Sequence, residues 1–420
     1  MNRKISLGTA ITVLILAVAL TISATMMLAM RHFSSLVSAV GQRQAMYDYL
    51  DEIDVAARDR YTIDEEALRA ALAKGYLQGL SDPYAAYLSS AEYQQVQNEL
   101  RGDRTGFGLQ LVVLENAEKV QELVVSHVDP NSPAALAGIK AGAIITEVDG
   151  AAVNGASYTA VMGRLDNEKK LRITVRQSDG TTTTELSSNT YSDVSVEGKI
   201  LQETVGYIRI RSFNNLTALQ FKNEYNKLTQ QGALYFVLDL RNNAGGSMDA
   251  VKEILDYLLP RGPYANCTKK DGVDMFTAAD TYEITAPTVT LVNGVTMGEA
   301  ELLAGALQEA GKTRLVGTST AGKAVVQEYF PLSADKSAVK LTTGALTLLS
   351  GANWQDTGLM PSQTVDLSLD KLMKFELLSA EEDDQLKAAL TLLTSGQYTN
   401  TATGTTTAAP TTTTTAATKN

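Results

Sequence analysis

Hydrophobic and polar positions along the chain follow four successive patterns. A nearly uncharged apolar run covers residues 5 to 30, and a helical pattern continues to about residue 100. Short alternating stretches separated by turns occupy residues 105 to 190, and continuous apolar runs alternate with amphipathic stretches beyond residue 205. Alternation with a period of two predicts half-buried strands, whereas continuous apolar runs predict fully buried ones. The chain therefore divides into segments of different structural class.

The first apolar run is long enough to cross the roughly 30 Å of hydrocarbon in a bilayer. Arg3 and Lys4 precede it, which favours a cytoplasmic N-terminus and an extracytoplasmic chain. A cleaved signal peptide usually has a shorter apolar stretch and a small-residue cleavage site, for which residues 23–25 are the alternative. We expect residues 1–32 to form an uncleaved transmembrane anchor that makes this a single-pass protein of the cell membrane.

Residues 33–104 are expected to form a helical arm. Apolar residues recur on one helical face between Asp64 and Leu80. Ser89 and Glu92 have the spacing of a capping box at the start of a further helix, which should end near residue 100.

The next segment, residues 105–190, has the turn signals of a small domain. Ser132 followed by Pro133 predicts the N-terminus of a helix. Residues 144–148 are expected to form a strand that an Asp-Gly turn closes. A second helix is predicted over residues 157–165 and the last strand over residues 170–177.

These features resemble a PDZ domain. The loop G-F-G-L is similar to the carboxylate-binding loop of PDZ domains, and the stretch from Ser132 to Ile145 resembles their middle part. A turn glycine that only needs a positive φ is the structural alternative for such a loop. The resemblance implies that backbone N–H groups hold the terminal carboxylate of a peptide, which adds to the neighbouring strand. The expected peptide-binding residues are Gly106, Phe107, Gly108 and Leu109.

Beyond residue 205 the pattern predicts two strand–helix units. Residues 235–240 form one buried strand, which a helix over residues 248–259 follows. Residues 288–292 form the second, followed by a helix over residues 299–310 and another strand. Strands that alternate with helices in this way indicate βαβ units and an α/β fold.

The motifs that follow these strands resemble those of C-terminal processing (tail-specific) peptidases. Residues 239–246 match the pattern D-L-R-x-N-x-G-G, and residues 317–327 match G-x-x-T-x-G-K-G-x-x-Q. The likeness covers roughly residues 40 to 395. It implies a crotonase-like protease core over residues 191–395, with the PDZ domain inserted before it, and a homodimer formed through helical arms.

The resemblance also implies a Ser/Lys-type peptidase. In such an enzyme a serine attacks the scissile carbonyl, a neutral lysine accepts its proton and a glutamine positions the lysine. Lys323 and Gln327 match the lysine and the glutamine, and the backbone N–H groups of Gly245 and Gly246 would help to hold the oxyanion. A lysine on its own is more often a solvated surface residue, so the assignment of Lys323 depends on its motif.

The serine of this family is missing. Its S-A-S-A-S-E segment corresponds to T-M-G-E-A-E at residues 296–301, which places Gly298 at the nucleophile position. Glycine has no side chain that could attack a carbonyl. Three interpretations stay open: a binding protein whose proteolysis is lost or impaired, a local misalignment, and an active endopeptidase with a displaced nucleophile at Thr296, Ser247 or Ser319. We expect the first.

Composition restricts the ligands. The net charge of −11 argues against nucleic acid, since phosphate binding needs a basic surface. The chain has two histidines, of which His127 is expected to be structural, so a Ser-His-Asp triad is nearly excluded. Cys267, the single cysteine, allows no intrachain disulfide and argues against a structural zinc site. We expect no metal or cofactor.

The expected ligands are therefore polypeptide C-termini or unfolded protein substrates outside the cytoplasmic membrane. Residues 396–420 consist almost entirely of threonine and alanine and have no apolar periodicity. Such a composition cannot bury a core, and we expect this tail to be disordered.

Overall fold

The structure is a computed structural model that describes residues 7–279 and 284–395 of the chain. The chain divides into two compact units, residues 1–76 and 77–420. The threonine- and alanine-rich tail expected over residues 396–420 lies outside the described residues.

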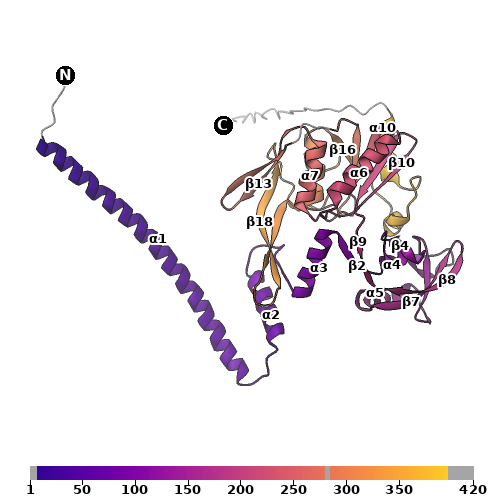
Figure 1. The fold of residues 1–420 in the computed structure, drawn as a ribbon, viewed down its shortest axis with the longest axis horizontal. Coiled ribbons are helices and arrows are strands. Elements are labelled where there is room, and N and C mark those ends of the chain that lie inside the picture. The colour runs from indigo at the N-terminus through magenta and orange to yellow at the C-terminus, as the bar shows by residue number, and fades with distance from the viewer. Residues whose placement is uncertain (1–6, 280–283, 396–420) are drawn as a thin grey trace, which may run out of the picture. The chain divides into compact units, whose positions relative to one another are not determined.

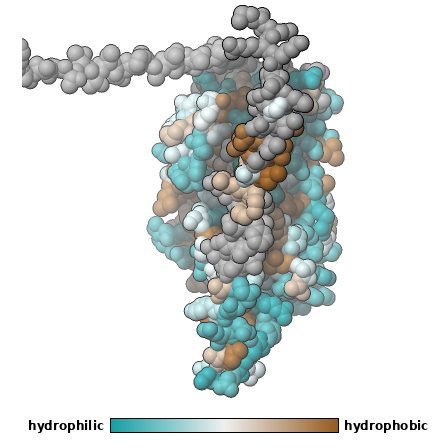
Figure 2. Space-filling view, turned by 90° about the vertical axis from the view of Figure 1, so that its left-hand side faces the viewer, coloured by the Kyte–Doolittle hydropathy of each residue, from teal (hydrophilic) through white to brown (hydrophobic). Residues whose placement is uncertain are grey.

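The first unit is helical. Helix α1 (Leu7–Arg58) is followed by a short loop and by α2 (Glu65–Gln78), where Asp64 accepts hydrogen bonds from the N–H groups of Glu66 and Ala67. Large hydrophobic side chains of α1 are exposed between residues 14 and 30, and Figure 2 colours such residues brown. No helix in the described part of the chain is both long and apolar enough to cross a membrane, so the transmembrane helix expected over residues 1–32 is not found.

The expected helical arm over residues 33–104 is only partly helical. Helix α3 (Ser90–Arg101) begins with the predicted capping box, in which Ser89 and Glu92 satisfy each other's backbone N–H groups. Strand β1 (Ala86–Leu88) lies between α2 and α3, and β2 (Asp103–Gly106) follows α3. Strand β2 pairs with β9 (Asn189–Ser192), so both ends of the intervening domain are tied together. Three-residue strands carry too little periodicity to be predicted locally.

The PDZ domain is an antiparallel sheet covered by two helices, at the lower right of Figure 1. The strand order is β3-β4-β5-β7-β8, with β6 paired to β5. Its core gathers apolar residues of alternate strand positions, among them Leu123, Val125, Ile145 and Ile173. The bounds are β3 Leu109–Glu115, β4 Gln121–Val128, α4 Pro133–Leu136, β5 Ile144–Val148, β6 Ala151–Ala152, α5 Tyr158–Asn167, β7 Lys170–Gln177 and β8 Gly180–Ser187.

Local signals of this domain are confirmed with one exception. Ser132 caps α4 by accepting a hydrogen bond from Ala135 N at 3.2 Å, and the Asp149-Gly150 turn has φ values of 49° and 79°. The prediction that β7 is the last strand is wrong, because β8 pairs with it along its whole length. Strand β8 is rich in exposed threonines, and a strand with one solvated face and few apolar residues gives little hydrophobic signal.

The protease-like core is built on one sheet of order β10-β11-β12-β15-β16-β19. All neighbours are parallel except β10 and β11. Helices α6, α7 and α8 cover one face of the sheet, and α10 covers the other. Successive strand residues point to opposite faces, so Leu238 belongs to one apolar cluster and Val237 to the other. The bounds are β10 Val196–Leu201, β11 Val205–Ile210, α6 Thr217–Gln230, β12 Tyr235–Asp239, α7 Met248–Leu258, β15 Thr288–Val292, α8 Glu299–Glu309, β16 Thr313–Gly317, β19 Gln363–Thr364 and α10 Asp384–Thr394.

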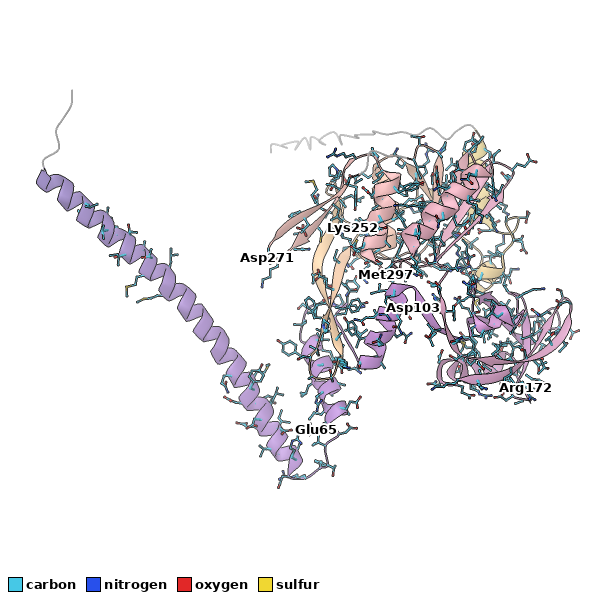
Figure 3. All side chains as sticks on the ribbon, viewed as in Figure 1. Glu65, Asp103, Arg172, Lys252, Asp271 and Met297 are labelled. Atoms are coloured by element: carbon cyan, nitrogen blue, oxygen red, sulfur yellow. The ribbon has the colours of Figure 1, made fainter. Side chains whose placement is uncertain are left out.

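A second sheet packs on helices α7 and α8. Its order is β1-β18-β13-β14, with β17 also paired to β18. Cys267 and Leu346 of this sheet are fully buried in the same apolar cluster as the two helices. Figure 3 labels Asp271 at the tip of the hairpin formed by β13 and β14. The bounds are β13 Gly262–Lys269, β14 Gly272–Ala278, β17 Val325–Pro331, β18 Ala338–Leu348 and, in the chain after β19, α9 Leu369–Met373.

Three loops meet at the carboxyl ends of β12, β15 and β16. These are residues 240–247, 293–298 and 318–324. Ligands of open α/β sheets bind in the crevice outside the carboxyl ends of parallel strands. All the motifs that the sequence singled out in this domain lie in these loops or directly after them.

Candidate active site

Gly298 occupies the sharp turn between β15 and α8. Its backbone has φ +62° and ψ −117°, a conformation that costs a residue with a side chain on the order of 1–3 kcal/mol. A Cβ atom at this position would meet only the Lys323 side chain, with Cδ at 4.0 Å. Nucleophiles of hydrolases are exposed on strained strand-to-helix turns of this kind. The turn thus has the geometry for a nucleophile, and Figure 3 labels its neighbour Met297.

Glu301, in the first turn of α8, holds the lysine loop in place. Its side chain is fully buried. One carboxylate oxygen accepts from Gly298 N at 2.9 Å and from Lys323 N at 2.8 Å. The other accepts from Gly322 N at 2.8 Å and from the Thr320 hydroxyl at 2.5 Å. One buried carboxylate therefore joins the Gly298 turn to the loop that carries the lysine.

Lys323 and Gln327 both contact Tyr84. The Lys323 ammonium is 5.4 Å from the centre of the Tyr84 ring, a cation–π distance. Gln327 donates from Nε2 to the backbone oxygen of Tyr84 at 3.0 Å. Lys323 precedes β17, and the pairing of β17 with β18 skips Thr343 of β18, so alternation along one regular strand does not relate Lys323 to Gln327. The role of Gln327 as a positioning residue for the lysine stays a prediction.

Tyr84 reaches this place because residues 80–88 add to the second sheet. Strand β1 pairs with β18, and Asp82 accepts from Thr342 N at 2.9 Å and from its hydroxyl at 3.0 Å. The Tyr84 hydroxyl accepts from Gln355 Nε2 at 2.8 Å, and Gln355 in turn accepts from Ala324 N at 2.9 Å. Tyr84 was not expected at the site, since it is more than 200 residues from Lys323 along the chain.

The two glycines of the expected oxyanion loop already have acceptors. Gly245 donates its N–H to the Asn243 side chain at 2.9 Å, within the loop. Gly246 donates to Oε2 of Glu299 at 3.1 Å. A Cβ atom on Gly245 would lie 2.3 Å from the same carboxylate oxygen, so the glycine leaves room for the Glu299 side chain.

Glu299 lies among charged groups of the cleft. Burial raises the pKa of Glu299 above its ordinary value, although the N–H groups of Gly246 and of Glu299 itself, and the positive charges of Lys323 and Lys340, act in the opposite direction. Burial also lowers the pKa of Lys340, and the charge of Lys323 lowers it further. The cleft therefore contains one carboxylate and two lysines close enough to influence one another.

The three hydroxyls considered as displaced nucleophiles have structural hydrogen bonds. Thr296 is fully buried and donates to Leu240 O at 2.9 Å. Ser247 caps α7 by accepting from Ala250 N at 3.3 Å. Ser319 donates to Thr357 O at 3.2 Å. Each hydroxyl therefore has a hydrogen bond that contributes to the fold.

The charged residues of the D-L-R motif are also structural. Asp239 and Arg241 are buried, and the guanidinium bonds both Asp239 and Asp383, with Nη2 at 2.6 Å and 2.7 Å from their carboxylates. Although burial acts in the opposite direction, Arg241 holds the pKa of Asp239 at about 2. In the described part of the chain no group of three or more His, Cys, Asp and Glu side chains could hold a metal ion.

The predicted peptide-binding loop, residues 106–109, lines a groove of the PDZ domain. Gly108 has φ +77°, and a Cβ atom there would lie 2.1 Å from Cβ of Ser132, so only glycine fits. The groove has a volume of ≈ 750 Å³ and extends along α5 past Met162 and Leu165. Arg104, which also lines the groove, forms ion pairs with Asp129 at 3.0 Å and with Asp193 at 3.1 Å.

Comparisons with known proteins agree with this architecture. A model of peptidase family S41 matches residues 204–365, and a PDZ domain model matches residues 95–176. The chain is 31% identical to the carboxyl-terminal-processing protease of a Picosynechococcus species, over 76% of this chain and 77% of that protein. The chain belongs to peptidase family S41. Its identity to the carboxy-terminal processing protease of Bacillus subtilis is 28%, over 79% of this chain and 72% of the relative.

A solved structure from Bacteroides fragilis that carries the S41 protease name shares the fold of this S41 chain. The TM-score is 0.57 at 19% sequence identity, and the match covers 81% of this chain and 92% of the other. Within the family pattern S-A-S-A-S-E, residues 296–301 keep only the final glutamate, Glu301; besides Gly298 at the nucleophile position, Glu299 stands where the pattern has alanine. That second difference was visible in the sequence, although its contact with Gly246 was not.

Proposed function

We propose that this S41 family member captures polypeptide C-termini through its PDZ domain and does not cleave them. Gly298 carries the proposal, because the turn that would present a nucleophile has the required backbone and no side chain. The alternative hydroxyls at Thr296, Ser247 and Ser319 each donate or accept elsewhere in the fold. Productive attack on a carbonyl tolerates errors of only about 1 Å in position.

The groove of the PDZ domain supports capture of a free C-terminus. Strand β3 lies at the edge of its sheet, so an extended peptide can pair with it. Residues 106–109 precede this strand and lie at the end of the groove, where backbone N–H groups can bind a carboxylate. Met162 and Leu165 of α5 offer apolar contacts to the side chains of the peptide.

A C-terminal processing endopeptidase is the second candidate. Its support is the 31% identity to a relative named carboxyl-terminal-processing protease, together with Lys323 at the lysine position of the motif. Such an enzyme would have to use a displaced threonine or serine. It would require a rearrangement that frees one of the three hydroxyls from its structural hydrogen bond.

Tail capture is tested with a fluorescent peptide of free C-terminus and with its amidated form. The free form should bind at least about 10-fold more tightly, because only it can accept from the N–H groups of the loop. Gly108→Ala should abolish this preference. Gly180→Ala is the matched control, since it changes a positive-φ glycine of the same domain whose Cβ would meet nothing within 4 Å. Equal affinity for both peptides would refute tail capture.

Loss of proteolysis is tested with the full chain and an unfolded protein or a tailed peptide as substrate. We expect no turnover by the natural chain. Turnover that disappears in Lys323→Ala would show that a displaced nucleophile is at work and would establish the second candidate. Turnover that persists in this variant would point to a contaminating protease.

Attachment to a membrane and dimerisation stay predictions. The support for attachment is the apolar run over residues 5 to 30 and the exposed hydrophobic side chains of α1. Recovery of the full chain in the membrane fraction, and of a chain lacking residues 1–32 in the soluble fraction, is the expected result. Light scattering in detergent distinguishes a dimer from a monomer.

A further inference from the structure

The side chain of Glu299 folds back over its own helix N-terminus. Its carboxylate accepts from Gly246 N at 3.1 Å, across the cleft from α8, and the N–H of Glu299 itself also donates to it. The two N–H groups belong to different loops, one after β12 and one after β15. They meet at this single carboxylate, directly beside the vacant position at Gly298.

Such a pair of N–H groups is what acyl transfer requires. An oxyanion hole is usually formed by the N–H of the residue after the nucleophile and by an N–H of a neighbouring loop. Here the residue after the nucleophile position is Glu299, and the neighbouring loop supplies Gly246. The negative oxygen of a tetrahedral intermediate would need the same two donors.

We propose that the Glu299 carboxylate is a built-in occupant of the oxyanion hole, so that the cleft is closed to acyl groups even when a nucleophile is present. This inference rests on the proposed loss of proteolysis and deepens it. Besides the missing serine, it gives a second reason for inactivity, which is a glutamate in the oxyanion hole. Glu299 therefore acts as an internal anion that blocks the cleft.

A glutamate in the first turn of a helix has a simpler use, because its charge complements the helix dipole. That role needs no contact with another loop. Glu299 instead contacts Gly246 across the cleft and fills the space beside Gly245, where a Cβ atom would lie 2.3 Å from its carboxylate. Two lysines, Lys323 and Lys340, face this carboxylate and favour its charged form. Glu301 already supplies a carboxylate to the Gly298 N–H, so Glu299 is not needed for that cap.

The first test restores the nucleophile with and without the glutamate. The full chain is prepared as Gly298→Ser, as Gly298→Ser/Glu299→Ala, and as the latter with Lys323→Ala. Each is treated with a fluorophosphonate probe and its intact mass is followed. The introduced hydroxyl oxygen bonds to phosphorus, fluoride leaves, and the proton passes to the Lys323 amine. A phosphoryl oxygen must enter the oxyanion hole for this reaction.

We expect the double variant to be labelled and Gly298→Ser to react at least about 100-fold more slowly, since loss of one oxyanion donor costs about 10²–10³ in rate. Adding Lys323→Ala should remove the labelling. Gly298→Ser/Glu299→Gln should stay slow, because an amide oxygen still fills the hole. Gly298→Ser/Glu253→Ala is the matched control, as Glu253 is exposed on α7, and it should behave like Gly298→Ser. Equal labelling of Gly298→Ser and the double variant overturns the proposal.

The second test needs no nucleophile and no turnover. In the natural chain the amide resonance of Gly246 should shift as Glu299 titrates, because the carboxylate is its acceptor. Lys323, Lys340 and Tyr329 also face Glu299, and Glu299→Gln separates their titration from that of the carboxylate. The shift should disappear in this variant. A Gly246 amide that titrates identically in both proteins overturns the proposal, whatever the labelling shows. Turnover by the natural chain would contradict both the proposed function and the blocked oxyanion hole, whereas an unaffected Gly246 amide would contradict the blocked hole alone.

Discussion

Replacing Glu301 should destabilise the protein more than any other single change near the cleft. Its buried carboxylate accepts four hydrogen bonds, from the N–H groups of Gly298, Gly322 and Lys323 and from the Thr320 hydroxyl. Glu301→Ala leaves these donors without their acceptor, and each buried donor left unsatisfied costs about 1–3 kcal/mol. Glu301→Gln keeps one oxygen. Whichever way the amide is turned, at least one backbone N–H loses its acceptor, at a cost of about 2 kcal/mol.

Urea denaturation followed by tryptophan fluorescence measures both losses, because Trp354 is buried in the same domain. The expected order of destabilisation is Glu301→Ala, then Glu301→Gln, then Glu253→Gln as the exposed control, with less than about 0.5 kcal/mol for the control. A Glu301→Gln chain as stable as the control would refute the view that this carboxylate organises the lysine loop.

Three further substitutions test other parts of the structure. Gly298→Ala should lower the free energy of unfolding by about 1–2 kcal/mol, because φ +62° strains a residue with a Cβ; an unchanged urea midpoint would contradict this. Ser247→Ala removes a helix cap and should lower the free energy of unfolding by about 1 kcal/mol. The same change added to Gly298→Ser/Glu299→Ala should leave its labelling by the probe unchanged. Burial alone would raise the pKa of Glu376, but Arg209 and Arg211 lower it from 4.5 to about 2. The charged carboxylate therefore stabilises the fold fully at pH values above 4.5. This stabilisation is lost as the pH falls through about 2. Glu376→Gln should therefore be less stable than the natural chain by about 3 kcal/mol at pH 7 and by almost nothing near pH 2, as thermal melts at both pH values would show.

Elements with strong local signals were predictable from the sequence. The apolar run at residues 288–292 forms β15 with the expected bounds, and that at residues 235–240 forms β12 to within one residue. Continuous apolar sequence can only be accommodated by burial on both faces, which leaves little choice of structure. The capping box at Ser89 was equally direct, because both of its hydrogen bonds are local.

Contacts between distant segments were not predictable in this way. The addition of β1 to β18 depends on Asp82 reaching Thr342, and nothing in either segment alone specifies that pairing. The position of Tyr84 beside Lys323 follows from it. The motif alone placed Gly298 at the nucleophile position. The contact of the next side chain, Glu299, with Gly246 N could not be predicted, because only the structure shows the direction of that side chain.

The lysine loop illustrates why a matching motif does not by itself indicate catalysis. Its backbone is held by Glu301, its neighbour Ala324 donates to Gln355, and the Lys323 ammonium lies over the Tyr84 ring. These contacts stabilise the fold whether or not a nucleophile is present. At residue 298, a serine would have to bear a strained φ of +62° that glycine adopts freely. Glycine at residue 298 therefore avoids this strain, and the folding contacts of the lysine loop do not depend on a side chain there. A chain with glycine at this position can therefore keep most of the protease pattern and a stable core, whether or not it cleaves peptides.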